Sequence, residues 1–144
     1  MTIFLTIISI AFLILVHELG HFLVAKFFGM AVDEFGIGFP PRIFSKKFGG
    51  TLYSFNLLPL GGFVRIHGET ASEGTLDEKS FMAAKHWKRA CVIIAGVVMN
   101  FMLGWAIIST IFFIGTPSAI LIETVLPDSP AEAVGLKQGD FVKD

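Results

Sequence analysis

Long apolar runs alternate with mixed segments along the chain, and this pattern divides it into four parts. The first run extends from Ile3 to about Phe28 and carries no charge before His17. The second run, Cys91 to Ile114, has 24 residues without a charge. A helix needs roughly 20 apolar residues to cross the hydrocarbon core of a bilayer, so both runs are predicted to span the membrane. Because no basic region precedes the first run and no small-residue cleavage site follows it, we expect an uncleaved helix rather than a signal peptide.

The segment between the two runs has the pattern of a small sheet. From Thr51 onward, alternate residues fall on opposite sides of a strand, with Tyr53, Phe55 and Leu57 on one side and Leu52, Ser54 and Asn56 on the other. The turn residues Pro59 to Gly62 follow, and Phe63 to Ile66 resumes the alternation, which predicts a hairpin. The earlier stretch Phe35 to Pro41 contains two glycines and two prolines, so it is expected to be irregular or short-stranded.

The polar tail has the signals of a small folded module. Ser129 is expected to cap a short helix with Pro130 at its first position, and Gly135 is expected to end that helix. Strands are expected near Val125 and at Phe141–Val142. The fold class is therefore an α-helical integral membrane protein, with two transmembrane helices and a membrane-associated β-hairpin or small sheet between them. The expected parts are residues 1–28 (first helix), 29–80 (β region), 81–115 (interfacial anchor and second helix) and 120–144 (tail module).

Composition and charge narrow the class of protein further. Hydrophobic residues make up 53% of the 144 positions and charged residues only 16%, whereas an ordinary soluble domain is about a quarter charged. The net charge of −1 argues against a nucleic-acid binder, which would need a basic patch. The single cysteine, Cys91, excludes an internal disulfide framework and is expected to be packed in the apolar run.

Basic residues predict the orientation in the membrane. Nine of the eleven lysines and arginines lie between Lys26 and Arg89, and none precedes Lys26. By the positive-inside tendency, residues 29–89 face the cytoplasm and both ends of the chain face outward. The ring of Trp87 and its basic neighbours are expected to anchor the second helix at headgroup depth.

The first apolar run contains the motif HELGH, from His17 to His21. Residues four apart lie nearly above one another on a helix, so both histidines can place ring nitrogens on one metal ion, with Glu18 beside them as a general base. The expected ion is Zn²⁺, which activates a water molecule for hydrolysis. Gly20 is expected to leave room near the metal. An accidental grouping of three ionisable residues is disfavoured, because each is costly on a membrane helix.

Two histidines do not complete a catalytic zinc site, which generally has three protein ligands. Asp33 and Glu34 lie beyond the predicted end of the first helix, and Glu123 is predicted on the opposite side of the membrane. No convincing third ligand is therefore predicted from these residues.

With these motifs assembled, the chain resembles the site-2 proteases, which are intramembrane zinc metalloproteases, and most closely their bacterial subgroup with PDZ domains. The resemblance rests on HELGH, FGIGFPP, PLGGFVRIHGE, KRACVIIAGVVMNF and SPAEAVGLKQGD, in that order. It implies that His17 and His21 are zinc ligands, that Glu18 is the catalytic base, and that residues 120–144 begin a truncated PDZ domain. It also implies a third ligand from an LDG-type aspartate on a later helix, so the chain is expected to be the N-terminal part of a longer protease.

The resemblance also suggests where substrate contacts the chain. The element from Leu58 to Ile66, with Gly61 and Gly62, looks like the family's β element that presents an edge to substrate. Asn100 matches the asparagine of the family's G-x-x-x-N pattern, although a helix–helix hydrogen bond would explain it equally well. A proline commonly follows the glycine of that pattern, whereas this chain has Val97, which puts the local helix shape in doubt.

The function implied is hydrolysis of peptide bonds in or near transmembrane segments of membrane proteins, such as single-span anti-sigma factors, in the bacterial inner membrane. The partners implied are these substrates and the lipid bilayer, with no nucleic acid. Two alternatives remain open: a catalytically inactive membrane adaptor with a PDZ domain, and another membrane metallopeptidase built on HExxH, whose third ligand would be a glutamate.

Overall fold

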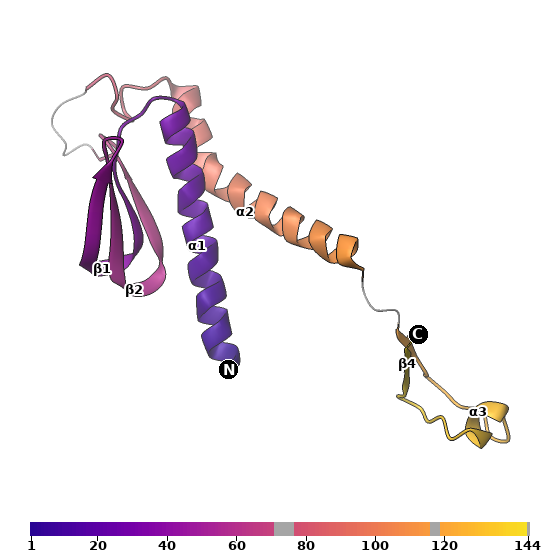
Figure 1. Ribbon diagram of the computed structural model, residues 1–144. Coiled ribbons are helices and arrows are strands. Elements are labelled where there is room, and N and C mark those ends of the chain that lie inside the picture. Colours follow the sequence, from indigo (N-terminus) through magenta and orange to yellow (C-terminus); the bar gives the residue numbers. More distant parts are fainter. Residues whose placement is uncertain (71–76, 116–118, 144) are drawn as a thin grey trace. The chain divides into compact units, whose positions relative to one another are not determined.

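The computed structural model describes residues 1–70, 77–115 and 119–143 (Figure 1). Contacts within the chain divide it into two units, residues 1–105 and 106–144, and each is described by itself. The elements in chain order are α1 (Thr2–Phe27), β1 (Val32–Phe48), β2 (Thr51–Ile66), α2 (His86–Ile114), β3 (Ala119–Leu121), α3 (Pro130–Ala133) and β4 (Phe141–Lys143).

Helix α1 is apolar on nearly every side, and only Gly20 and Ala25 are buried. Its 26 residues extend over about 39 Å at about 1.5 Å per residue, more than the roughly 30 Å of a hydrocarbon core. By length and composition, both α1 and α2 could cross a membrane, as the sequence predicts. The helix ends where Gly29 adopts a φ of 78° and the Met30 amide donates to the Ala25 carbonyl at 3.0 Å, a glycine-dependent helix end.

Helix α2 begins at His86, several residues before the predicted start at Cys91. Part of the expected interfacial anchor is therefore helical, because Lys88, Arg89 and Ala90 are good helix formers. The Trp87 ring meets the Phe28 ring edge to face at 5.2 Å between centroids, which joins the start of α2 to the end of α1. The expectation of a packed Cys91 is wrong, since this residue is exposed on the helix.

The two helices approach each other closely at Gly20. A Cβ atom built on Gly20 would lie 2.5 Å from the Ala95 carbonyl oxygen on α2, so a side chain there would push the helices apart. Gly20 thus makes room for the backbone of α2, and its expected role of leaving room near the metal stays a prediction. The core of the first unit lies towards the C-terminal end of α1. It is formed by Ala25, Met30, Val32, Ile66, Phe81 and Val92.

Strands β1 and β2 are long, and they pair with each other antiparallel. The turn between them is Gly49–Gly50, where both residues have positive φ (57° and 83°), as a two-residue hairpin turn requires. The expected turn at residues 59–62 is wrong, because β2 runs through it without a break. Residues 35–41 lie within β1, and the expected irregularity is present there, with register shifts between Ile37 and Phe39 and a φ of 78° at Gly38.

Each strand bends, which lets one part of β1 pair on both edges. Glu34 is paired with both Arg65 and Leu52, and Ile37 with both Gly62 and Phe55. The register shifts along β1 fall between these pairings. The segment 34–37 is therefore the inner part of the sheet, and residues 62–65 lie beside it.

The sheet buries polar side chains and exposes apolar ones. Ser54 and Asn56 are buried, whereas Phe55 and Leu57 are exposed, so the predicted alternation is present with the polar side inward. The Asn56 amide donates to the Gly38 carbonyl at 3.1 Å. This hydrogen bond holds the bend in β1 from inside the sheet.

A buried carboxylate ties the two strands together in the same interior. Glu34 is 4% exposed, accepts a hydrogen bond from Arg42 at 2.7 Å and lies 3.7 Å from Arg65. Arg42 belongs to β1 and Arg65 to β2, so one side chain bridges three segments of the sheet. A buried carboxylate with two guanidinium partners avoids the cost of an unpaired charge.

The second unit contains the short helix that the sequence predicts. Ser129 caps α3 and accepts a hydrogen bond from the Glu132 amide at 3.3 Å, with Pro130 at the first position. Gly135 follows the helix with a φ of 83°. Leu121 of β3 pairs with Phe141 of β4, so the first strand lies before the expected position at Val125.

Candidate metal centre

His17 and His21 lie one turn apart on α1, and their rings meet edge to face with centroids 4.7 Å apart. The His21 Nδ1 lies 2.7 Å from the Val92 carbonyl oxygen on α2. Because a carbonyl can only accept, Nδ1 is the donor, which leaves Nε2 as the nitrogen that can bind a metal. A backbone carbonyl is a common partner for the second nitrogen of a metal-binding histidine.

Gly96 of α2 faces the free nitrogens of both rings. A Cβ atom built on Gly96 would lie 2.5 Å from Nε2 of His17 and 2.6 Å from Nε2 of His21. Both nitrogens therefore converge on one small space that a methyl group would fill. Neutral imidazole nitrogens converging in this way suit Zn²⁺, which binds histidine at about 2.0–2.1 Å, so the residues present fit the metal that the sequence predicts.

The half-buried Glu18 side chain contacts β2. Its Oε2 accepts a hydrogen bond from the Val64 amide at 3.1 Å. Together with His21 and Glu69, it lines a cavity of about 260 Å³. The carboxylate and one of the histidines thus border the same space, which is the arrangement a general base next to a metal requires.

Other acidic side chains near the helix end are engaged elsewhere. Asp33 lies 3.2 Å from Nδ1 of His67, and Glu34 is held by Arg42. Within residues 1–70, 77–115 and 119–143, no three histidine, cysteine or acidic side chains are grouped as metal ligands. The described part of the chain therefore provides two ligands.

The predicted substrate-contact residues lie close to this centre. Cβ atoms built on Gly61 and Gly62 would lie 2.8 Å from Ile14 and 2.9 Å from Leu15, respectively. These glycines let β2 pass close to α1, just before His17. Asn100 lies one turn beyond Gly96 on α2, and its buried side-chain oxygen has no hydrogen-bond partner in the described part of the chain. None of these contacts tests substrate binding.

Three groups at the centre are absent from the sequence-based site: the Val64 amide, the Val92 carbonyl and Gly96. The first two are backbone groups, and backbone groups leave no signal in the residue types. Gly96 does have a signal, because it is the glycine of the G-x-x-x-N pattern that ends at Asn100.

Two helices long and apolar enough to span a membrane, with a histidine pair on a helical HExxH motif, are typical of a membrane protein with a metal-binding centre. The model of peptidase family M50 matches residues 5–140. The chain belongs to this family, so the sequence-based expectation of a site-2 protease is confirmed. Family membership and the two apolar helices together indicate a membrane location.

Several bacterial proteins are similar to the chain, and they are provisionally named zinc metalloproteases. One from Clostridium perfringens is 40% identical over 149 aligned positions, gaps included, and the alignment covers 99% of this chain and 42% of that protein. One from Thermotoga maritima is 40% identical over 132 residues, covering 90% of this chain and 26% of that protein. One from Fusobacterium nucleatum is 42% identical over 109 residues, covering 75% and 31%. The chain thus spans less than half the length of these relatives.

Proposed function

We propose that the full-length protein is a zinc-dependent peptide hydrolase. The observation that carries this proposal is the convergence of the His17 and His21 Nε2 atoms opposite Gly96, with Glu18 on the adjoining cavity. The names of the relatives support zinc as the metal.

Each side chain of the motif has a distinct task in this reaction. His17 and His21 hold the zinc ion, and the Val92 carbonyl fixes the orientation of His21. Bound zinc supplies Lewis acidity, which polarises a carbonyl and activates water. Glu18 takes a proton from the attacking water and passes it to the leaving amine. The third ligand, an aspartate in the family pattern, is proposed to come from outside the described residues.

The proposed substrates are transmembrane segments of membrane proteins, such as single-span anti-sigma factors. The site lies on an apolar helix, and a peptide in helical form protects its scissile bonds, so the substrate must unwind. Residues 61–64 of β2 lie beside α1 and could pair with an extended substrate. The Val64 amide of this stretch holds the Glu18 carboxylate beside the site.

The proposed location is the bacterial inner membrane, with residues 29–89 on the cytoplasmic side. This orientation rests on the nine basic residues between Lys26 and Arg89. The capped helix α3 and the strands beside it in sequence support the proposal that residues 120–144 begin a PDZ domain on the outer side.

Two substitutions in the full-length protein test the assignment. Glu18→Gln should keep zinc and lose cleavage of a membrane-spanning substrate, whereas His17→Ala should lose both zinc and cleavage. Zinc content is measured by elemental analysis and cleavage by gel assay in the same preparations. Undiminished cleavage by the Glu18→Gln protein would rule out the proposed base, and wild-type protein without zinc would favour an inactive adaptor.

A further inference from the structure

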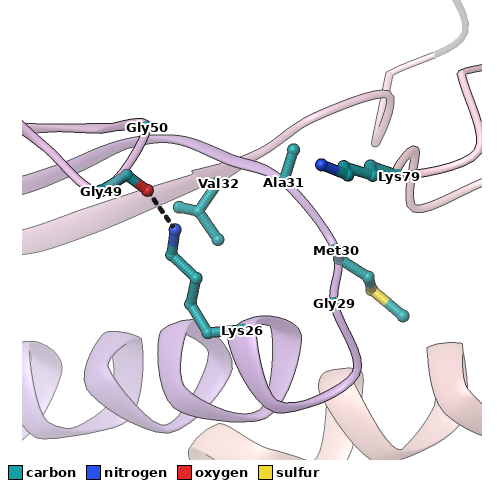
Figure 2. A pocket seen from close by; sticks show the side chains of 8 residues that line it. All are labelled: Lys26, Gly29, Met30, Ala31, Val32, Gly49, Gly50 and Lys79. Carbon is teal, nitrogen blue, oxygen red and sulfur yellow. Dashed lines mark hydrogen bonds between the residues drawn. The ribbon is translucent and has the colours of Figure 1, made fainter.

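A second pocket, of about 390 Å³, lies where α1 ends and the strands begin. Figure 2 shows the lysine side chains of Lys26 and Lys79 at this pocket, together with the turn glycines Gly49 and Gly50. It shares no lining residue with the cavity beside Glu18. The pocket is therefore separate from the metal centre.

Two lysines line this pocket, and no acidic side chain among the described residues lines it with them. Neither lysine forms an ion pair among the described residues. The Lys26 ammonium donates only to the Gly49 carbonyl, at 3.3 Å. Two lysines that line one pocket without an acidic partner among the described residues favour an anionic ligand.

Glycines keep the walls of the pocket open. Gly29, Gly49 and Gly50 all have positive φ (78°, 57° and 83°), and a Cβ atom on any of them would meet nothing within 4 Å. Because these three residues have no side chains, they line the pocket with backbone atoms alone. The buried side chains of Met30 and Val32 complete the lining on its inner side.

The position along α1 suggests where the anion comes from. Lys26 is in the last turn of an apolar helix long enough to span a bilayer. At the same helix end, Phe28 contacts Trp87, and the Lys88 ammonium lies 5.5 Å from the Phe28 ring. Aromatic rings mixed with cations are typical of headgroup depth. The carbonyls of this helix end are already partly satisfied by the Gly29 and Met30 amides.

We propose that this pocket binds a phosphate group, held between the ammonium groups of Lys26 and Lys79. The phosphate is either the headgroup of an anionic phospholipid or a soluble phosphate, since both present the same oxygens to the lysines. The proposal rests on the membrane location and does not depend on peptidase activity.

The test uses purified full-length protein in neutral detergent, with native mass spectrometry to count bound lipid. Phosphatidylglycerol is compared with phosphatidylcholine, and inorganic phosphate is added alone and as a competitor. Lys26→Gln/Lys79→Gln is the test variant, and Lys46→Gln/Lys47→Gln, from strand β1 outside the pocket lining, is the control with the same change in charge. Lys26→Arg/Lys79→Arg keeps both charges, and zinc content in every variant checks that the protein is folded.

Wild type should retain phosphatidylglycerol over phosphatidylcholine, and the test variant should lose about fivefold in affinity for each lysine removed. The control and the arginine variant should bind as wild type does. Lipid retention that phosphate cannot displace identifies a headgroup, while saturable binding of phosphate alone identifies a soluble ligand. Equal retention of both lipids without phosphate binding, or an unchanged affinity in the glutamine variant, would overturn the proposal.

Discussion

Replacing Gly96 by alanine is expected to weaken zinc binding strongly while leaving the protein folded. The new methyl carbon would lie 2.5 Å from Nε2 of His17 and 2.6 Å from Nε2 of His21. Non-bonded heavy atoms prefer separations of about 3.5 Å or more, so the rings must move by about 1 Å. Zinc sites tolerate ligand displacements of only about 0.2 Å.

The expected loss of zinc affinity follows from that mismatch. Mutating a residue that merely orients a metal ligand costs about 10–100-fold in affinity, and this methyl group displaces both ligands directly. We therefore expect a loss of at least about 100-fold. The helix itself should not suffer, because alanine is better than glycine inside a helix by about 1 kcal/mol.

Gly104 provides a matched control on the same helix, since a Cβ atom built there would meet nothing within 4 Å. Zinc affinity is measured by competition with a chelator, and folding by thermal unfolding, in the full-length protein. Gly104→Ala should bind zinc as wild type does and unfold at the same or a higher temperature. Wild-type zinc affinity in the Gly96→Ala protein would refute the convergence of the two histidines on this space.

Three further substitutions test the contacts around the centre. Val64→Pro removes the amide that holds Glu18 and should lower kcat by about 100-fold with zinc content unchanged. Val64→Ala keeps this amide and should keep most activity. Equal rates in the two variants would contradict the positioning role. Gly20→Ala should destabilise the protein by about 1–3 kcal/mol, because its Cβ would lie 2.5 Å from the Ala95 oxygen; an unchanged unfolding midpoint would contradict the close approach. Glu34→Gln should weaken the pairing of β1 with β2 by about 1–3 kcal/mol, which hydrogen exchange of strand amides would detect, and unaltered protection would contradict it.

The helices and the histidine pair could be predicted because their signals are local. An uncharged run of 24 residues is a membrane helix in almost any context, and positions 17 and 21 share a helix face by geometry alone. Family membership, which those motifs predicted, is confirmed by the match over residues 5–140.

The sheet could be predicted only in part, because strand pairing is not local. The alternation around Phe55 is present, but two turn signals compete along the chain. Residues 59–62 have turn chemistry yet continue β2, while Gly49–Gly50 forms the turn. The pairing of Glu34 on both edges depends on contacts with Leu52 and Arg65, which no window of sequence around Glu34 contains.

The surroundings of the metal centre were equally beyond sequence reasoning. Val64 and Val92 act through backbone atoms, so their side chains carry no information about the role. Gly20 was expected to leave room near the metal. Which residues it contacts depends on which face of α1 is covered by α2. That choice is made by packing across 75 residues of sequence, from Gly20 to Ala95.

The reversed sidedness of the sheet has a practical consequence for handling the protein. Phe44 and Phe55 face outward while Asn56 and Glu34 are buried, so interior hydrogen bonds stabilise the sheet in addition to the apolar contacts of Val32 and Ile66. A protein with such a surface has low solubility in buffer, because exposed apolar strands associate with one another. An amphiphile chosen for purification must therefore coat the strands as well as the two helices, and a truncation that keeps only residues between the helices should aggregate.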